Sequence, residues 1–144
     1  MAKSKSIGKL KKDLDKVFNR YIRFRDTEDG YGVCISCGHG KPFEELDAGH
    51  FYAKQGYDGL RYNEDNVHAE CRKCNRFDDS HLISYHDNLL GKIGNAGMAK
   101  LYNFGLVKGW ANRDLEGATA YVMNLKGGEE VSKLVGILTD RHHR

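Results

Sequence analysis

The sequence lacks most features that mark membrane, secreted and fibrous proteins. It has one proline and one tryptophan among 144 residues, and no stretch approaches the roughly 18 consecutive apolar residues of a membrane span. Residues 1–12 carry charges but no apolar core of a secretory signal peptide. With 40% apolar and 30% charged residues, we expect a folded, water-soluble protein.

Basic residues are concentrated at the start of the chain. Residues 1–25 hold nine Lys or Arg and two Asp, a net charge of +7, whereas the rest of the chain has a net charge of −4. This asymmetry indicates a polyanionic partner rather than a membrane, with a solvated terminus as the plainer alternative. Apolar residues recur here at helical spacing, which predicts an amphipathic helix: Leu10, Leu14, Val17, Phe18, Tyr21 and Ile22.

The four cysteines form two Cys-x-x-Cys pairs, Cys34–Cys37 and Cys71–Cys74. Without a secretory signal, a disulfide framework is disfavoured. Two such pairs can wrap one tetrahedral zinc ion, each supplying two thiolates from a tight turn. Because four protein thiolates close the coordination sphere, the zinc is expected to be structural; redox chemistry or an iron–sulfur cluster is the alternative.

The residues between the two pairs are too many for a simple zinc knuckle. Segments 45–52 and 60–62 are rich in aromatic and apolar residues and flank a glycine-containing loop, which predicts a short antiparallel hairpin. A helix is expected from near Cys71, because apolar residues then recur at mostly helical spacing. His81 and His86 fall on this helix and are expected to be solvated.

Several of these residues together resemble the HNH nuclease motif of the zinc-containing ββα-metal fold: Asp47, His50, Asn66, Cys71, Cys74 and Asn75. A longer set of segments is more similar to the bacteriophage NinG/Rap family of recombination nucleases: residues 11–23, 47–51, 60–62, 66–68 and 71–76. The resemblance covers about residues 9–94. It implies a phage-encoded enzyme in the bacterial cytoplasm that cuts branched recombination intermediates, such as Holliday junctions and D-loops, with a divalent metal.

The resemblance also implies roles for individual residues. His50 would be the general base, since imidazole can accept a proton near neutral pH. Asn66 would hold the loop that carries this base. A catalytic Mg²⁺ or Mn²⁺ would be held by oxygen ligands from Asp47, Asn75 and Asp79.

One departure from the motif affects Asp47. Many HNH enzymes place a metal ligand directly before the base, but here Gly49 occupies that position. On a regular strand Asp47 and His50 point to opposite faces. A bulge at Ala48 and Gly49 could bring both to one face; without it, Asn75 and Asp79 would have to hold the ion.

Basic side chains near these motifs are expected to contact DNA phosphates. They are Lys11, Lys12, Arg20, Arg23, Lys54, Arg61, Arg72, Lys73 and Arg76. Tyrosines beside the hairpin loop suit unpaired bases at a branch point, although packing of the hairpin explains at least one of them equally well.

The sequence therefore predicts an α+β protein with three parts. They are a basic helical arm at residues 1–26, a zinc-stapled HNH-like ββα-metal core at 27–94 and a helical extension at 95–144, with further helices at 112–126 and 129–141. The expected function is a structure-selective endonuclease of phage recombination, acting on branched double-stranded DNA as a homodimer with phage recombination proteins as possible partners. The alternatives are a general HNH nicking or restriction-type nuclease and a non-catalytic zinc-ribbon DNA-binding adaptor.

Overall fold

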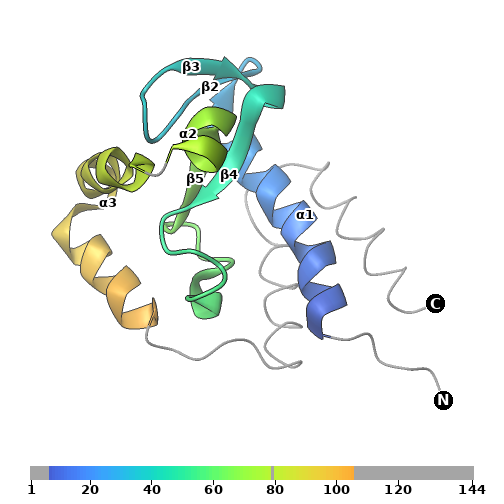
Figure 1. Cartoon of the computed structure of the whole chain (residues 1–144), viewed down its shortest axis with the longest axis vertical. Coiled ribbons are helices and arrows are strands. Elements are labelled where there is room, and N and C mark those ends of the chain that lie inside the picture. Colours follow the sequence, from blue (N-terminus) through green and yellow to red (C-terminus); the bar gives the residue numbers. More distant parts are fainter. Residues whose placement is uncertain (1–6, 79, 106–144) are drawn as a thin grey trace. The chain divides into compact units, whose positions relative to one another are not determined.

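The computed structural model describes residues 7–78 and 80–105 and shows a mixed α+β protein with two small antiparallel sheets (Figure 1). The elements in chain order are α1 (Ile7–Arg25), β1 (Thr27–Glu28), β2 (Tyr31–Val33), β3 (Gly40–Pro42), the 3₁₀ turn η1 (Phe43–Glu45), β4 (Leu46–His50), the 3₁₀ turn η2 (Asp58–Leu60), β5 (Val67–Cys71), α2 (Arg72–Phe77) and α3 (His81–Gly105). Within the described residues, no helix is long and apolar enough to cross a membrane. The helices expected at 112–126 and 129–141 lie outside the described residues.

The chain divides into two units, and residues 22–109 form the one that contains the strands. The helix α1 begins in the other unit and ends in this one. Its predicted amphipathic character is confirmed by the burial of Leu14, Val17, Phe18, Tyr21 and Ile22.

The first sheet has the order β1-β2-β3. Strands β1 and β2 are joined by Asp29 and Gly30, which both have positive φ, at 52° and 82°. This is the backbone of a type I′ turn, for which Asp-Gly is a favoured pair because glycine reaches positive φ without steric cost. The turn therefore follows directly from the local sequence.

The second sheet is the hairpin of β4 and β5. The strands pair one-to-one from Leu46 opposite Cys71 to His50 opposite Val67. The predicted first strand is confirmed, but the prediction of a second strand at residues 60–62 is wrong, because Leu60 ends a 3₁₀ turn and the partner strand begins at Val67. Residues 51–66 form the connecting loop.

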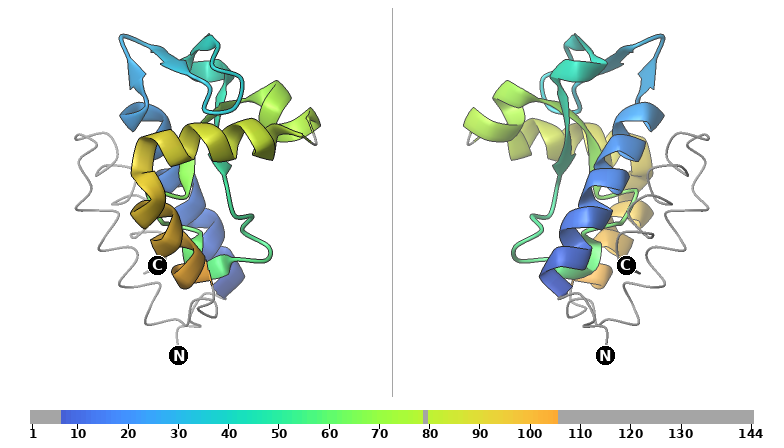
Figure 2. Two further views of the ribbon diagram at one scale, coloured as in Figure 1. Left: turned by 90° about the vertical axis from the view of Figure 1, so that its left-hand side faces the viewer. Right: turned by 90° about the vertical axis from the view of Figure 1, so that its right-hand side faces the viewer.

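The helix predicted to begin near Cys71 is confirmed as α2, which is followed by α3. Gly94 interrupts α3 with φ 72° and ψ 175°, and Figure 2 shows two arms with different directions. Because of this bend, Leu89 from the first arm and Leu101 from the second join one core cluster with Leu60 and Tyr85.

Tyr85 connects this core to the hairpin. Its ring is fully buried, and its hydroxyl donates a 2.7 Å hydrogen bond to the carbonyl of Gly49 in β4. Burial raises the pKa of Tyr85 well above its usual value, and the nearby carboxylates of Glu70 and Asp26 act in the same direction. The hydroxyl therefore remains a protonated donor.

We predict that Tyr85→Phe destabilises the protein by about 1–3 kcal/mol, because a buried carbonyl loses its donor. Tyr102→Phe is the matched control: this ring is 60% exposed, so its loss of a hydroxyl should change stability by less than about 0.5 kcal/mol. Urea unfolding followed by fluorescence measures both. Equal stability of the two variants would contradict the structural role of the Tyr85 hydroxyl.

Candidate functional site

Four cysteine sulfurs converge between the turn that follows β2 and the junction of β5 with α2. All four Sγ atoms lie within 4.8 Å of one another, and those of Cys37 and Cys71 are 3.8 Å apart. Sulfurs at the corners of a zinc tetrahedron with Zn–S bonds of about 2.3 Å stand about 3.8 Å apart. The donor set and its spacing therefore fit one structural zinc ion.

Local backbone geometry positions the first pair. The amide of Cys37 points at the Cys34 sulfur at 3.4 Å, and Gly38 donates to the Cys34 carbonyl at 2.9 Å. Gly38 has φ 77°, which glycine adopts without strain. Burial opposes ionisation of the Cys37 thiol, but hydrogen bonds from the backbone and ring of His39 prevail and lower its pKa to about 6. A metal ligand must be a thiolate, and this environment favours one.

The proposed base, His50, lies at the last position of β4. Its Nε2 is 3.0 Å from the carbonyl oxygen of Arg61 in the loop. Because a carbonyl only accepts, Nε2 must carry the proton, which leaves the lone pair of the neutral ring on Nδ1. The loop thereby sets both the tautomer and the orientation of this imidazole.

Asn66 fastens that loop. Its side chain is fully buried and makes three hydrogen bonds to backbone. The amide of Tyr52 donates to Oδ1 at 2.9 Å, and Nδ2 donates to the carbonyls of Tyr52 at 3.1 Å and Leu60 at 3.2 Å. Phe51, next to His50, also donates to the Asn66 carbonyl at 2.8 Å. Asn66, at the end of the loop, thus bonds to its start at Tyr52 and to its middle at Leu60.

Asp47 and Asn75 meet on the face of the hairpin that α2 covers. Nδ2 of Asn75 donates to Asp47 at 3.0 Å, and Arg76 donates to both carboxylate oxygens of Asp47 at 2.9 Å. The one-to-one register contains no bulge at Ala48 and Gly49, so the strand follows the regular one of the two alternatives considered from the sequence. Asp47 and His50 accordingly belong to opposite faces of the hairpin. The third expected ligand, Asp79, lies outside the described residues.

The basic residues expected to contact DNA differ in their exposure and in their protein partners. Lys12, Arg72, Lys73 and Arg76 are exposed, whereas Arg20, Arg23, Lys54 and Arg61 are half-buried. The side chain of Lys11 lies outside the described residues. Arg76 is paired with Asp47, Arg72 donates to the Glu44 carbonyl, and Arg23 stacks over the Phe43 ring at 4.5 Å. At the start of α2, Lys73 is therefore the cation best presented to solvent.

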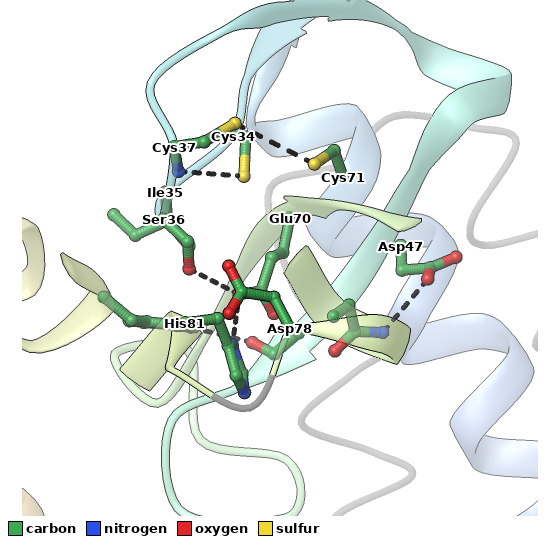
Figure 3. A network of polar contacts seen from close by, with 12 residues as sticks. Cys34, Ile35, Ser36, Cys37, Asp47, Glu70, Cys71, Asp78 and His81 are labelled. Carbon is green, nitrogen blue, oxygen red and sulfur yellow. Dashed lines mark hydrogen bonds and ion pairs between the residues drawn. The ribbon is translucent and has the colours of Figure 1, made fainter. Parts of the chain in front are cut away.

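Sequence reasoning missed a buried network centred on Glu70. This residue is fully buried in β5. One of its oxygens, Oε2, accepts hydrogen bonds from Ser36, in the turn that follows β2, and from His81 at 2.6 Å (Figure 3). The expectation that His81 is solvated is wrong, since its side chain is only 17% exposed. No local pattern signals this network, because its members are joined only by the fold.

A second missed feature lies at the end of α1. Arg25 grips Asp26 at 2.7 and 3.0 Å and donates to the carbonyls of Glu64 and Val67. Asp26 accepts from the amide of Ala69 at 2.8 Å. Burial alone would raise the pKa of Asp26, but Arg25 and the Ala69 amide hold it below its usual value. The sequence signal that could have indicated this contact is the adjacent Arg25 and Asp26 at the end of the amphipathic helix.

Neighbouring His68 is a neutral core residue. It is 4% exposed, and burial, together with the positive charges of Arg25 and Lys92, lowers its pKa to about 3. Its ring lies edge-on to Tyr85, with centroids 6.2 Å apart. At neutral pH it therefore contributes packing and no positive charge toward DNA.

Comparison with known proteins gives a consistent assignment. The family model described as "NinG: Bacteriophage Lambda NinG protein" matches residues 1–126. Proteins named "Protein ninG" are 35% identical over 83 residues in Escherichia phage lambda and 32% identical over 90 residues in Salmonella phage P22. These matches cover 58% and 62% of this chain but 39% and 42% of the relatives, so the chain spans about two fifths of the relatives it matches. No solved structure matches.

We predict that the protein binds one zinc ion per chain through four sulfurs at about 2.3 Å. Cys74→Ser should lose zinc and unfold at a lower temperature, because β5 and α2 would no longer be joined to the turn after β2. Metal analysis, X-ray absorption and thermal unfolding test this. An intact variant with unchanged stability, or a zinc shell dominated by nitrogen or oxygen, would contradict the assignment.

Proposed function

The chain belongs to the NinG family of bacteriophage proteins, and from this premise we propose that it is a divalent-metal-dependent endonuclease that cuts branched DNA during phage recombination. The observation that carries the proposal is the fixed imidazole of His50, whose Nε2 is bonded to the Arg61 carbonyl at 3.0 Å. Its place in the sequence, at the end of a strand, before a buried asparagine and between the two Cys-x-x-Cys pairs, is the arrangement expected from the HNH resemblance.

Hydrolysis of a phosphodiester requires a water molecule that loses a proton as it attacks. With Nε2 protonated toward Arg61, the Nδ1 atom of His50 has the lone pair that can take this proton. The attack is efficient only if the base is held in place, and the three hydrogen bonds of Asn66 hold the loop that positions it. Asn66 would therefore act on the reaction through His50.

The proposal also calls for a divalent cation, which would stabilise charge on the scissile phosphate and the leaving oxygen. Of the ligands expected from the sequence, Asp47 is already neutralised by Arg76 on both oxygens. It fits a cation only when Arg76 turns away, for example to a DNA phosphate. Among the described residues, no three carboxylates or imidazoles converge as the cysteines do.

Branched DNA is the substrate that best suits the surface around this site. Helix α2 presents exposed Lys73 beside Phe77, whose ring is 81% exposed. Cations bind phosphates of any sequence, and an exposed aromatic ring can stack on an unpaired base. A four-way junction has two strands to cut, so we expect two copies of the chain to act together, alongside other phage recombination proteins.

We predict that His50→Ala lowers the rate of cleavage about 100- to 10,000-fold while DNA binding persists, because it removes the proton acceptor. His86→Ala is the control, since that imidazole is half-exposed on α3 and pairs only weakly with Asp87 at 3.4 Å. The assay compares a four-way junction, a D-loop and a linear duplex of matched sequence, with Mg²⁺ or Mn²⁺ and with EDTA.

Each outcome of this assay selects one function. Cleavage of branched DNA only, lost in His50→Ala, supports the proposal. Equal cleavage of all three substrates would replace it with a general nicking nuclease. Binding without cleavage under either metal would overturn the enzymatic proposal and leave a zinc-stabilised DNA-binding adaptor.

We further predict that Lys73→Ala weakens binding of branched and linear DNA alike and lowers the salt dependence by about one phosphate contact. Lys100→Ala, also an exposed lysine but in the second arm of α3, should leave both quantities nearly unchanged. Fluorescence anisotropy without divalent metal, repeated at several salt concentrations, measures them. If the two lysine variants behave alike, α2 is not the DNA-binding face.

A further inference from the structure

Glu70 is a buried carboxylate with one oxygen that no protein group satisfies. Its side chain is fully buried, and among the described residues its partners, Ser36 and His81, both approach Oε2. The other oxygen, Oε1, is buried without a hydrogen-bond partner. Buried carboxylate oxygens are normally hydrogen-bonded, paired with a cation or bound to metal, because leaving them without a partner is strongly destabilising.

The unsatisfied oxygen is directed at the backbone of Gly49. A Cβ atom placed on Gly49 would lie 2.2 Å from Oε1, so any larger residue there would displace the carboxylate. Glycine at this position thus leaves the space that the Glu70 carboxylate uses. Gly49 sits opposite His68 in the hairpin register, so Gly49, His68 and Glu70 belong to one face.

Asp47 provides an internal comparison on the same face. It is the direct cross-strand partner of Glu70, but the two carboxylates have different side-chain partners. Arg76 neutralises Asp47 through both oxygens. Among the described residues, the side-chain partners of Glu70 are an imidazole and a hydroxyl, both on Oε2, so Oε1 is the carboxylate oxygen on this face that has no partner.

We propose that Glu70 and His81 form a second divalent-cation site, separate from the four cysteines. The carboxylate oxygen and the imidazole nitrogen are the protein ligands, and water completes the coordination. A mixed oxygen and nitrogen donor set suits Mn²⁺ better than Mg²⁺, which prefers oxygen ligands alone. We therefore expect the site to bind Mn²⁺ more tightly than Mg²⁺.

The observed geometry needs little change to accept a cation. Nδ1 of His81 is 2.6 Å from Oε2 of Glu70. Two neighbouring ligands on an ion at about 2.1 Å stand about 3.0 Å apart, so the pair has to open by only about 0.4 Å. His81 is the first residue of α3, where a small shift of the side chain disturbs few helical contacts.

The site is close to the proposed base in sequence but lies on the other face of the hairpin. Gly49, which the carboxylate of Glu70 abuts, immediately precedes His50. Because Glu70 shares a face with its cross-strand partner Asp47, a cation held here is on the face opposite His50, and the inference does not rest on the proposed nuclease function. Cation binding itself does not depend on that function, and it can be measured without DNA.

The experiment titrates Mn²⁺ into protein loaded with one equivalent of zinc and follows free Mn²⁺ by electron paramagnetic resonance. We expect the wild type to bind one Mn²⁺ and to prefer it to Mg²⁺ in competition. Glu70→Gln keeps the size of the side chain and one acceptor oxygen but removes the anionic ligand, and His81→Ala removes the second ligand from a partly exposed position. Each should weaken Mn²⁺ binding about tenfold or more.

Asp87→Asn is the matched control, because Asp87 and His86 form a similar but exposed pair on α3. It should leave Mn²⁺ affinity within about twofold of the wild type, since surface pairs of this kind hold ions weakly. Zinc content and circular dichroism confirm that all variants are folded. Unchanged affinity in both Glu70→Gln and His81→Ala, or no Mn²⁺ binding by the wild type at millimolar concentration, would overturn the site.

DNA cleavage by the same proteins separates this inference from the proposed function. Wild type that binds Mn²⁺ through Glu70 and His81 but cuts no DNA supports the cation site and overturns the nuclease. Wild type that cuts branched DNA while Glu70→Gln and His81→Ala both bind Mn²⁺ as tightly as wild type supports the nuclease and overturns the site.

Discussion

The strand β5 is the constraint on which the rest of the unit depends. All five of its residues are buried, yet the sheet it forms with β4 has only two strands. Its outer edge therefore presents backbone groups that need partners other than a third strand. Asp26 accepts from the Ala69 amide at 2.8 Å, and the amide of Ile35 donates to the Ala69 carbonyl at 2.9 Å. The end of α1 and the cysteine turn thus complete the edge, which is why both are fixed relative to the hairpin.

The sequence predicted the features that depend on short spacing. The two Cys-x-x-Cys pairs predicted a metal centre, and the four sulfurs do converge. The turn at Asp29 and Gly30 was not predicted, although such a pair favours it. The strand β5 escaped prediction because its buried His68 and Glu70 look like surface residues of a loop. Their burial is compensated by Tyr85, Ser36 and His81, which come from distant parts of the chain, and no local pattern reports such partners.

Partners that come from distant parts of the chain also explain why the sequence pointed to Asp47, and not to Glu70, as a metal ligand. From the sequence, Asp47 was the natural carboxylate to consider, because it lies three residues before His50. The structure shows a regular strand without a bulge, and α2 brings Arg76 onto Asp47. Charge alone therefore does not identify a cation ligand. What distinguishes Glu70 is the combination of full burial, one unsatisfied oxygen and a neighbouring imidazole, and each of these is a property of the fold.

The loop at residues 51–66 holds the imidazole of His50 in place with little regular structure beyond the short 3₁₀ turn η2. Ordering such a loop costs conformational entropy at every residue, and the hydrogen bonds of buried Asn66 to Tyr52 and Leu60 offset part of that cost at the loop's two ends. The carbonyl of Arg61 then fixes the ring of His50. Asn66 is an effective anchor because its amide both donates and accepts, so an isosteric aspartate or leucine could not satisfy the same three backbone groups. The proposed proton acceptor is thus held in place by the loop itself, while exposed Lys73 of α2 remains available for the proposed contact with DNA.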